Sequence, residues 1–343
     1  MRYTTLGNTG TIVSTFALGT MTFGAEADEA TSGDMLATFF TAGGTLIDTA
    51  DVYSAGVSEE IIGRWLATHP TEQAQAVIAT KGRFPMGHGP NDHGTSRRHL
   101  RVALDASLAR LGVDHIDLYQ LHAWDPVTPI EETLRFLDDA VSAGKIGYYG
   151  FSNFLGWQLT KAVHVARALG FSAPVTLQPQ YNLLVRDIEH EVVPAALDAG
   201  MGLLPWSPLA GGWLSGKYAR DIAPTGKTRL GEEPERGMEA WTARNADVRT
   251  WRVVDAVTEV ANRHSASASQ VSLAWLLAQP AMCSVILGAR TVDQLTDNLG
   301  AAEIELTTTE ITHLDTISTP ITGDYPYGPA GINQRHRASD AKG

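Results

Sequence analysis

The sequence predicts an α/β protein folded as a single (β/α)8 TIM barrel, with its active site at the C-terminal face of the strands. Eight short apolar runs alternate with longer amphipathic segments along the chain. Polar or aromatic side chains directly follow six of these runs. The 343 residues are enough for such a barrel, which usually takes roughly 250 residues plus insertions.

The alternation of strands and helices predicts parallel strands joined by right-handed crossovers. An open doubly wound sheet usually carries a glycine-rich first turn, and no G-x-G-x-x-G follows a strand here. We therefore favour the closed barrel over the open sheet. The predicted strands cover 16–18, 46–47, 77–80, 116–121, 146–151, 175–177, 202–205 and 285–287.

Helical periodicity is clearest over 96–111, where leucines at 100, 104, 108 and 111 share one face. Another helix is predicted to begin at Thr128, with Pro129 in its first position and Glu131 completing a capping box. The other predicted helices cover 31–42, 58–67, 156–169, 189–199, 247–263, 269–279 and 292–299.

Residues 1–318 are predicted to form the single barrel domain, and 319–343 a C-terminal tail rich in Gly, Pro and polar residues. The segment 218–237 is rich in Gly, Pro and charge and reads as a long loop. Loops of this length in a compact domain often serve function.

Composition limits the partners of the chain. A net charge of −12 argues against nucleic acid or an anionic membrane surface as a partner. Cys283 is the single cysteine and lies in an apolar run, so we expect a buried thiol. No apolar run is long enough to span a bilayer and none resembles a signal peptide, so a cytoplasmic location is expected. The oligomeric state stays open.

The residues that end the apolar runs are expected to meet at one face. Parallel strands place their C-terminal ends together at the mouth of a barrel, where barrel enzymes keep their active sites. The residues in this position are Asp48, Lys81, His122, Asn153, Gln178 and Trp206.

Lys81 and Tyr53 suggest acid–base chemistry. An ammonium beside a phenol lowers the phenol pKa, which suits Tyr53 to protonate an oxygen that becomes an alkoxide. Lys81 and Asp48 could also form an ion pair with a purely structural role. His122 could be a packed rim residue or a neutral donor that orients a carbonyl oxygen.

Six segments together resemble the aldo-keto reductases. They occur in the family's order and extend over nearly the whole chain, and their combination is far more specific than any one of them. They are GTLIDTADVYSAG (44–56), ATKGR (79–83), DLYQLHAWD (117–125), GFSNF (150–154), PWSPLAGGWLSGKY (205–218) and ILGARTVDQLTDNL (286–299).

The resemblance implies a catalytic tetrad. Tyr53 would be the general acid, Lys81 would lower its pKa, Asp48 would hold Lys81, and His122 would position the carbonyl. The hydride would come from C4 of a reduced nicotinamide, so no metal is expected. The implied function is reduction of aldehydes or ketones to alcohols, with a small-molecule carbonyl compound as substrate.

The resemblance also implies a set of cofactor contacts. Trp206 would stack on the nicotinamide, and Ser152, Asn153 and Gln178 would hold its carboxamide. Arg290, beside a helix start, would suit an adenosine 2′-phosphate, so NADPH is expected and NADH is less favoured. The remaining predicted contacts are Gly19, Thr20, Met21, Asp48, Ser207, Pro208, Leu209, Gly211, Leu214, Gly216, Lys217, Arg229, Gly288, Gln294, Asp297 and Asn298.

Structural roles would also fit several of these residues. The glycines could form turns, Gln294 could complete a capping box with Thr291, and Trp206 could be packing. The predicted substrate pocket contains Phe23, Tyr53, Phe84, His122 and Trp124. These residue types suit medium-sized aldehydes, aromatic ketones or dicarbonyls.

Other enzyme classes fit the sequence less well. A Schiff-base aldolase could use Lys81, but it would not explain the segments 206–217 and 288–298. The tyrosine–lysine spacing of short-chain dehydrogenases and the early His-x-His of metal-dependent barrel hydrolases are both missing. Potassium-channel β subunits resemble the same family, so a regulatory subunit that binds NADP(H) and turns over slowly is the alternative function.

Overall fold

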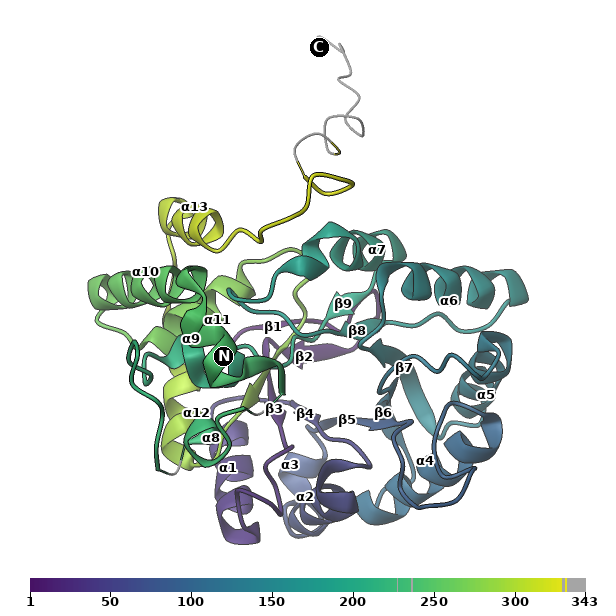
Figure 1. Cartoon of the computed structure of the whole chain (residues 1–343). Helices are drawn as coiled ribbons and strands as arrows, with labels where there is room; N and C mark the ends of the chain where they lie inside the picture. Colours follow the sequence, from purple (N-terminus) through teal and green to yellow (C-terminus); the bar gives the residue numbers. More distant parts are fainter. Residues whose placement is uncertain (227, 236, 329–330, 332–343) are drawn as a thin grey trace.

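Eight parallel strands form the barrel that the sequence predicts, with helices around its outer surface (Figure 1). The computed structural model describes residues 1–226, 228–235, 237–328 and 331. Around the barrel the strands follow the order β10-β3-β4-β5-β6-β7-β8-β9. They are β3 (Phe16–Gly19), β4 (Leu46–Asp48), β5 (Val77–Gly82), β6 (Ile116–Leu121), β7 (Ile146–Ser152), β8 (Thr176–Gln178), β9 (Gly202–Leu203) and β10 (Val285–Gly288).

Backbone hydrogen bonds close the barrel between β9 and the segment that leads into β10. Leu203 N–H donates to Ala281 O (2.8 Å), and Cys283 N–H donates to Leu203 O (3.0 Å). Ile286 N–H then donates to Pro205 O just beyond β9 (3.0 Å). The sheet therefore has no free edge at this junction.

The register of the strands brings their C-terminal ends together. Asp48 pairs with Gly19 of β3, and Lys81 of β5 pairs with Gln120 of β6. Ser152 of β7 pairs with Gln178 of β8. Most strand residues are buried, as expected for parallel strands covered on both faces.

The predicted helices all form, with ends displaced by at most a few residues. Ser96 caps α4 by accepting a hydrogen bond from His99 N–H (3.3 Å). The helices that were predicted are α1 (Glu29–Thr41), α2 (Val57–Thr68), α4 (Arg97–Leu111), α5 (Ile130–Ser142), α6 (Gly156–Leu169), α7 (Val192–Ala199), α10 (Val248–His264), α11 (Ala268–Leu277) and α12 (Val292–Leu299). Four further helices among the described residues were not predicted: α3 (Pro70–Gln73), α8 (Arg229–Glu232), α9 (Trp241–Ala246) and α13 (Thr308–Ile317).

The capping box predicted at Thr128 is wrong. Pro129 occupies the cap of α5, and the cap has no side-chain hydrogen bond. The Thr128 hydroxyl donates instead to Asp125 Oδ2 (2.7 Å). Asp125 also accepts from Thr95 N–H and Val127 N–H, so its carboxylate organises this loop and draws Thr128 away from the helix.

A short hairpin at the N-terminus was not predicted. Its strands β1 (Tyr3–Thr5) and β2 (Ile12–Ser14) pair antiparallel. Leu6 and Val13 pack against residues inside the barrel, among them Leu118 of β6. Gly7 has φ +57°, and a Cβ there would lie 2.1 Å from the Val175 carbonyl oxygen, so the hairpin turn sits directly on the start of β8. The hairpin closes the end of the barrel opposite the strand C-termini.

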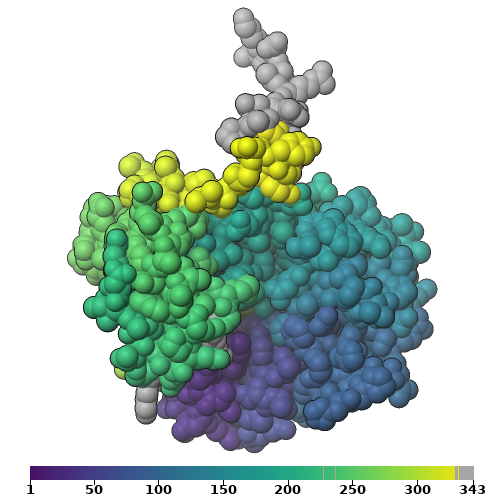
Figure 2. All heavy atoms as spheres, viewed as in Figure 1, coloured from purple at the N-terminus to yellow at the C-terminus, as the bar shows by residue number. Residues whose placement is uncertain are grey.

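The segment after β9 packs on one side of the barrel, where it lies within the green area of Figure 2 together with α10 and α11. It contains the 3-10 helix η3 (Ala210–Ser215), then α8 and α9. Trp241 of α9 stacks on Trp213 of η3 (ring centroids 5.0 Å apart) and contacts Trp251 of α10 edge-on (6.4 Å). These aromatic contacts hold the segment against α10.

The described part of the predicted tail leaves α13 and passes over α7 (Figure 1). Tyr327 stacks on His190 (4.9 Å) and donates a hydrogen bond to Glu191. Residues 329–330 and 332–343 of the predicted tail lie outside the described residues. Within the described part of the chain, no helix is both long and apolar enough to cross a membrane.

Candidate active site

Three of the four predicted tetrad residues meet around one buried ammonium group. Lys81 Nζ donates to Asp48 Oδ2 (2.6 Å), to the Thr49 carbonyl oxygen (2.8 Å) and to the Tyr53 hydroxyl (3.3 Å). The Lys81 side chain is completely buried at the end of β5. Tyr53 comes from the 3-10 helix η1 (Tyr53–Gly56) after β4, and the residue as a whole is partly exposed.

The Asp48 carboxylate is held from its other side by two amides. Gln178 Nε2 donates to Asp48 Oδ1 (2.8 Å), and Gln120 Nε2 donates to the same oxygen (3.3 Å). Gln178 was predicted as a carboxamide ligand, whereas its amide group here supports Asp48. Gln120 was not singled out from the sequence, because it lies inside β6 rather than at its end.

The pKa of Tyr53 is higher than that of a free tyrosine, because burial disfavours the phenolate. The Lys81 charge opposes that effect without reversing it. The Lys81 charge therefore acts in the predicted direction, and burial is the larger effect. Burial also acts to lower the pKa of Lys81, yet the charges of Asp48 and Tyr53 outweigh it and raise that pKa. Lys81 is a cation at neutral pH.

His122, the fourth tetrad residue, lies beside Tyr53. The two rings contact edge-on, with centroids 5.8 Å apart, and Phe84 packs on the imidazole at 4.6 Å. Burial, aided by the charges of Lys81 and Arg83, holds the pKa of His122 well below its usual range. The imidazole is therefore neutral and can donate one hydrogen bond to an oxygen placed between it and Tyr53.

The predicted pocket residues Phe84 and Trp124 lie in the loops after two neighbouring strands, β5 and β6. Phe84 contacts His122, and Trp124 in the neighbouring loop contacts Phe154 and Trp157 edge-on. Phe23 differs from the prediction, since its side chain is completely buried in the core and faces no open pocket. The Ser54 hydroxyl, from η1 after β4, donates to Phe23 O (2.7 Å) and so joins the loop after β3 to the loop after β4.

A second buried acid, Asp51, lies behind the tetrad. Sequence reasoning missed it although it stands between Asp48 and Tyr53. The backbone of Val52 faces its carboxyl group, but neither oxygen makes a side-chain hydrogen bond with the described residues. Burial and the nearby Glu59 carboxylate raise the pKa of Asp51 to about 7. Glu59 itself accepts from Thr80 Oγ1 (2.5 Å) and Arg110 Nε (2.7 Å).

We predict that Asp51→Asn stabilises the protein at alkaline pH. A carboxyl group with a pKa near 3.8 when unfolded and about 7 when folded holds its proton more strongly in the folded state. Its ionisation therefore lowers the free energy of unfolding as pH rises across that window. The neutral asparagine should restore up to about 4 kcal/mol at pH about 8 and nothing at pH about 4. Urea unfolding at both pH values measures this, and an equal effect at both would contradict the assignment.

Polar residues at the ends of β7 and β8 form a connected platform. Ser152 Oγ donates to Gln178 O (2.9 Å), and Asn153 Nδ2 donates to His122 O (3.0 Å). Trp206 Nε1 donates to Asn153 Oδ1 (3.0 Å), which fixes the indole at the edge of the site. Asn153 has φ +57°, a left-handed conformation that asparagine tolerates better than most residues.

A buried asparagine that the sequence analysis missed supports the next loop. Asn182 Nδ2 donates to Ser207 O (2.9 Å), and Asn182 Oδ1 accepts from Leu184 N–H and Val185 N–H. Ser207 has φ +52°, so the chain turns sharply after Trp206. The sequence marks Asn182 only as a polar residue between the apolar Tyr181 and Leu183.

The predicted pyrophosphate loop turns through two glycines with positive φ. Gly211 has φ +63° and Gly212 φ +100°, and a Cβ on Gly212 would lie 2.3 Å from Lys217 Cε. Lys217 therefore folds directly over the loop. Burial lowers the pKa of Lys217, and the charges of Arg290 and Arg229 lower it further, so the three cations lie close together. Such a cluster suits an anionic ligand.

The remaining loop residues line this turn. Pro208 and Leu214 are buried, while Leu209 is partly exposed and Gly216 is exposed. At the end of β3, Gly19 is the last strand residue, Thr20 is buried with its hydroxyl donating to Asp48 O (3.0 Å), and Met21 is exposed. The contacts of Thr20 thus join the first strand end to the tetrad.

The predicted adenosine-binding residues lie around the start of α12, after an exposed Gly288. Thr291 caps the helix, but Gln294 Oε1 accepts from Arg290 N–H (3.0 Å), so only half of the proposed capping box forms. Asp297 accepts from Ser267 Oγ (2.9 Å) and Gln270, at the start of α11, and Asn298 is buried. In this structure Asp297 therefore joins two helices.

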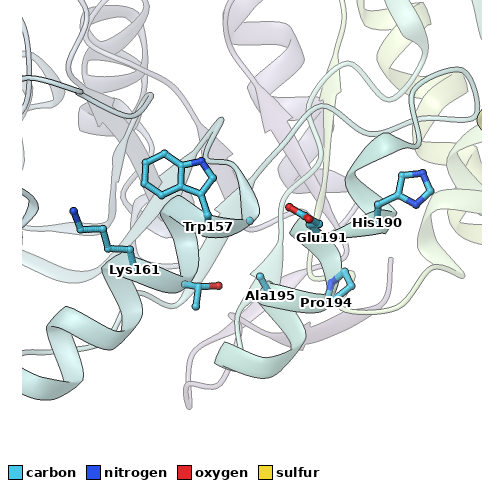
Figure 3. A pocket seen from close by; sticks show the side chains of 8 residues that line it. Trp157, Lys161, His190, Glu191, Pro194 and Ala195 are labelled. Atoms are coloured by element: carbon cyan, nitrogen blue, oxygen red, sulfur yellow. The ribbon is translucent and has the colours of Figure 1, made fainter. Parts of the chain in front are cut away.

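A separate groove of ≈ 580 Å³ lies on the outer side of the barrel between α6 and α7 (Figure 3). Trp157 and Lys161 of α6 line one side, and Glu191 and Pro194 line the other. It contains none of the tetrad residues, so we place the chemistry at the barrel mouth and not here.

Comparisons with known proteins agree with this architecture. The sequence model of the Aldo/keto reductase family matches residues 15–319. The chain is similar to an uncharacterized oxidoreductase, YrpG, of Bacillus subtilis (strain 168), with 40% identity over 89% of this chain and 92% of the relative.

Two further relatives are named for different activities. A versiconal hemiacetal acetate reductase of Aspergillus parasiticus is 32% identical over 98% of this chain and 100% of its own length. A probable voltage-gated potassium channel subunit beta of Oryza sativa subsp. japonica is 35% identical over 89% of this chain and 92% of the relative. With a matching family model over most of its length and relatives of this similarity, the chain belongs to the aldo/keto reductase family of oxidoreductases.

Proposed function

We propose that this protein reduces aldehydes or ketones to alcohols with NADPH, using Tyr53 as the general acid. The observation that carries the proposal is the Lys81 ammonium, which contacts both Asp48 Oδ2 (2.6 Å) and the Tyr53 hydroxyl (3.3 Å). An ion pair with a purely structural role would not need a tyrosine hydroxyl as the third hydrogen-bond partner of the ammonium group. Tyr53 is partly exposed and lies beside His122 at the barrel mouth, where a bound substrate would meet its hydroxyl.

The residues around the mouth fit a dinucleotide. The Lys217, Arg229 and Arg290 cluster would hold its phosphates, and Gly211 and Gly212 would let the backbone approach them. Trp206, held by Asn153, would stack on the nicotinamide. When bound, the reduced nicotinamide supplies a hydride to the carbonyl carbon.

The tetrad would supply the proton. As negative charge develops on the carbonyl oxygen, the Tyr53 hydroxyl donates its proton to that oxygen, and an alcohol results. Lys81 then stabilises the Tyr53 phenolate, while Asp48 and its two glutamine partners keep Lys81 in place. The neutral His122 donates a hydrogen bond that aligns the carbonyl oxygen.

The substrate class we propose is medium-sized aldehydes, aromatic ketones or dicarbonyls. Phe84 and Trp124 would give the pocket an aromatic wall next to His122. The reductase named for versiconal hemiacetal acetate, among the relatives, is consistent with carbonyl chemistry on this scaffold. A cytoplasmic location stays a prediction.

A turnover assay tests the proposal. The absorbance of NADPH would be followed with 4-nitrobenzaldehyde and with methylglyoxal, and NADH would be run in parallel. Carbonyl-dependent oxidation supports the reductase. Tight NADPH binding without turnover of any carbonyl would instead favour a regulatory subunit like the named potassium-channel relatives. Absence of nucleotide binding would contradict both functions.

Arg290→Ala tests the nucleotide preference. Arg290 would contact the 2′-phosphate that only NADPH carries, so its loss should raise the NADPH Kd by about 10- to 100-fold, while the NADH Kd changes by about 3-fold at most. Fluorescence titration of both nucleotides measures the two constants. Equal losses would remove Arg290 from 2′-phosphate recognition.

A further inference from the structure

Arg290, just after β10, holds two carboxylates that come from the segments after the two neighbouring strands, β3 and β9. Its Nη1 contacts Glu232 Oε2 at 2.9 Å, and its Nη2 contacts Glu26 Oε1 at 3.5 Å. Glu26 lies in the loop after β3, whereas Glu232 ends α8 in the long segment after β9. The Arg290 side chain is only 18% exposed, so its guanidinium group is enclosed by these two partners.

Both carboxylates lie where the nucleotide phosphates are expected. Arg290 is close enough to Lys217 for the two charges to affect each other, and Arg229 opens the same short helix that Glu232 ends. The site thus combines a cation cluster with an acidic pair on its outer edge. A cluster built only to attract phosphate would gain nothing from carboxylates on the same guanidinium group.

The two kinds of charge suit two different nucleotides. In dinucleotide sites a carboxylate typically accepts hydrogen bonds from the free ribose hydroxyls of NADH, whereas an arginine accommodates the 2′-phosphate of NADPH. Here Arg290 and the two glutamates occupy the same part of the proposed nucleotide site. A 2′-phosphate must take Arg290 from the glutamates and then stay beside their negative charge. A ribose diol can bond to a glutamate directly.

We propose that Glu26 and Glu232 are specificity-determining residues, which compete with the 2′-phosphate for Arg290 and so narrow the preference for NADPH over NADH. This inference rests on the proposed nicotinamide-dependent function. The protein then uses both nucleotides, with Arg290 favouring NADPH and the acidic pair favouring NADH. Neutralising the pair shifts the balance toward NADPH.

The test compares Glu232→Gln and the double variant E26Q/E232Q with wild type. Fluorescence titration gives the Kd of NADPH and of NADH for each protein. We expect Glu232→Gln to lower the NADPH Kd by about 5- to 10-fold and the double variant to lower it further, because a charge within a few ångströms of the phosphate is removed. The NADH Kd should stay the same or rise.

Glu29→Gln is the matched control. Glu29 lies three residues after Glu26, is exposed and pairs with Arg64 (2.8 Å), so its loss changes the net charge equally without touching Arg290. The control should leave the ratio of the two Kd values unchanged, and thermal unfolding of all variants should match wild type.

Three results would overturn the inference. An unchanged NADPH Kd would show that the carboxylates do not compete with the phosphate. A weaker Kd for both nucleotides would mean that Glu232 only fastens α8 to the barrel. An equal gain for both nucleotides, or the same gain in Glu29→Gln, would mean that net charge alone acts. If wild-type protein binds neither nucleotide, the proposed function fails instead, and this outcome is distinct from the other three.

Discussion

Tyr53→Phe should lower kcat by about 1,000-fold, within the roughly 100- to 10,000-fold range of general acid catalysis. The substitution removes only the hydroxyl that lies 3.3 Å from Lys81 Nζ. Without it, no group of the tetrad can give a proton to the developing alkoxide, because Lys81 is buried beneath the ring and His122 holds its single proton in a neutral imidazole. The NADPH Kd should stay within about 3-fold of wild type, since no phosphate or nicotinamide contact is lost.

Steady-state kinetics and nucleotide titration together check this result. Tyr148→Phe is the matched control, because the Tyr148 hydroxyl bonds to Thr11 near the N-terminal hairpin and not to the tetrad. Turnover of the control should match wild type. Unchanged turnover in Tyr53→Phe would remove Tyr53 from the acid role.

Lys81→Met should affect both activity and stability. The variant leaves the buried Asp48 carboxylate without its ammonium partner, which typically costs about 3–5 kcal/mol. It also removes the cation that stabilises the Tyr53 phenolate, so kcat should fall by about 100-fold or more. Urea unfolding and steady-state kinetics measure the two effects.

The double variant Asp48→Asn with Lys81→Met separates the effect on stability from the effect on activity. A neutral asparagine can still accept the amide hydrogen bonds of Gln178 and Gln120, so stability should return close to that of wild type. Activity should not return, because the cation is still missing. Recovery of turnover in the double variant would mean that Lys81 serves only as a structural partner of Asp48.

The barrel could be predicted because its signals are local. Each strand is a short apolar run, and the polar residue after it marks the C-terminal face, so Asp48, Lys81 and His122 could be placed together before any coordinates. The ends of α6 and α12 agree with the predicted ranges 156–169 and 292–299. Gly170 ends α6 in a left-handed conformation, and the Thr291 side chain caps α12.

Features that depend on distant contacts could not be predicted in this way. The support of Asp48 by Gln120, the burial of Asp51 and the enclosure of Arg290 by Glu26 and Glu232 all join residues far apart in the chain. Phe23 was misplaced because an aromatic residue in a loop at the barrel mouth reads the same whether it faces the pocket or the core. The effect of burial on the Tyr53 pKa could not be inferred from the sequence, whereas the effect of the Lys81 charge could.

Transfer of deuterium from the cofactor tests the central claim most directly. The protein would be incubated with 4-nitrobenzaldehyde and NADPH that carries deuterium at both C4 positions, and the product analysed by mass spectrometry. We predict 4-nitrobenzyl alcohol with one deuterium on the carbinol carbon, formed by wild type and largely lost in Tyr53→Phe. Alcohol without deuterium, or full activity in Tyr53→Phe, would contradict hydride transfer assisted by Tyr53.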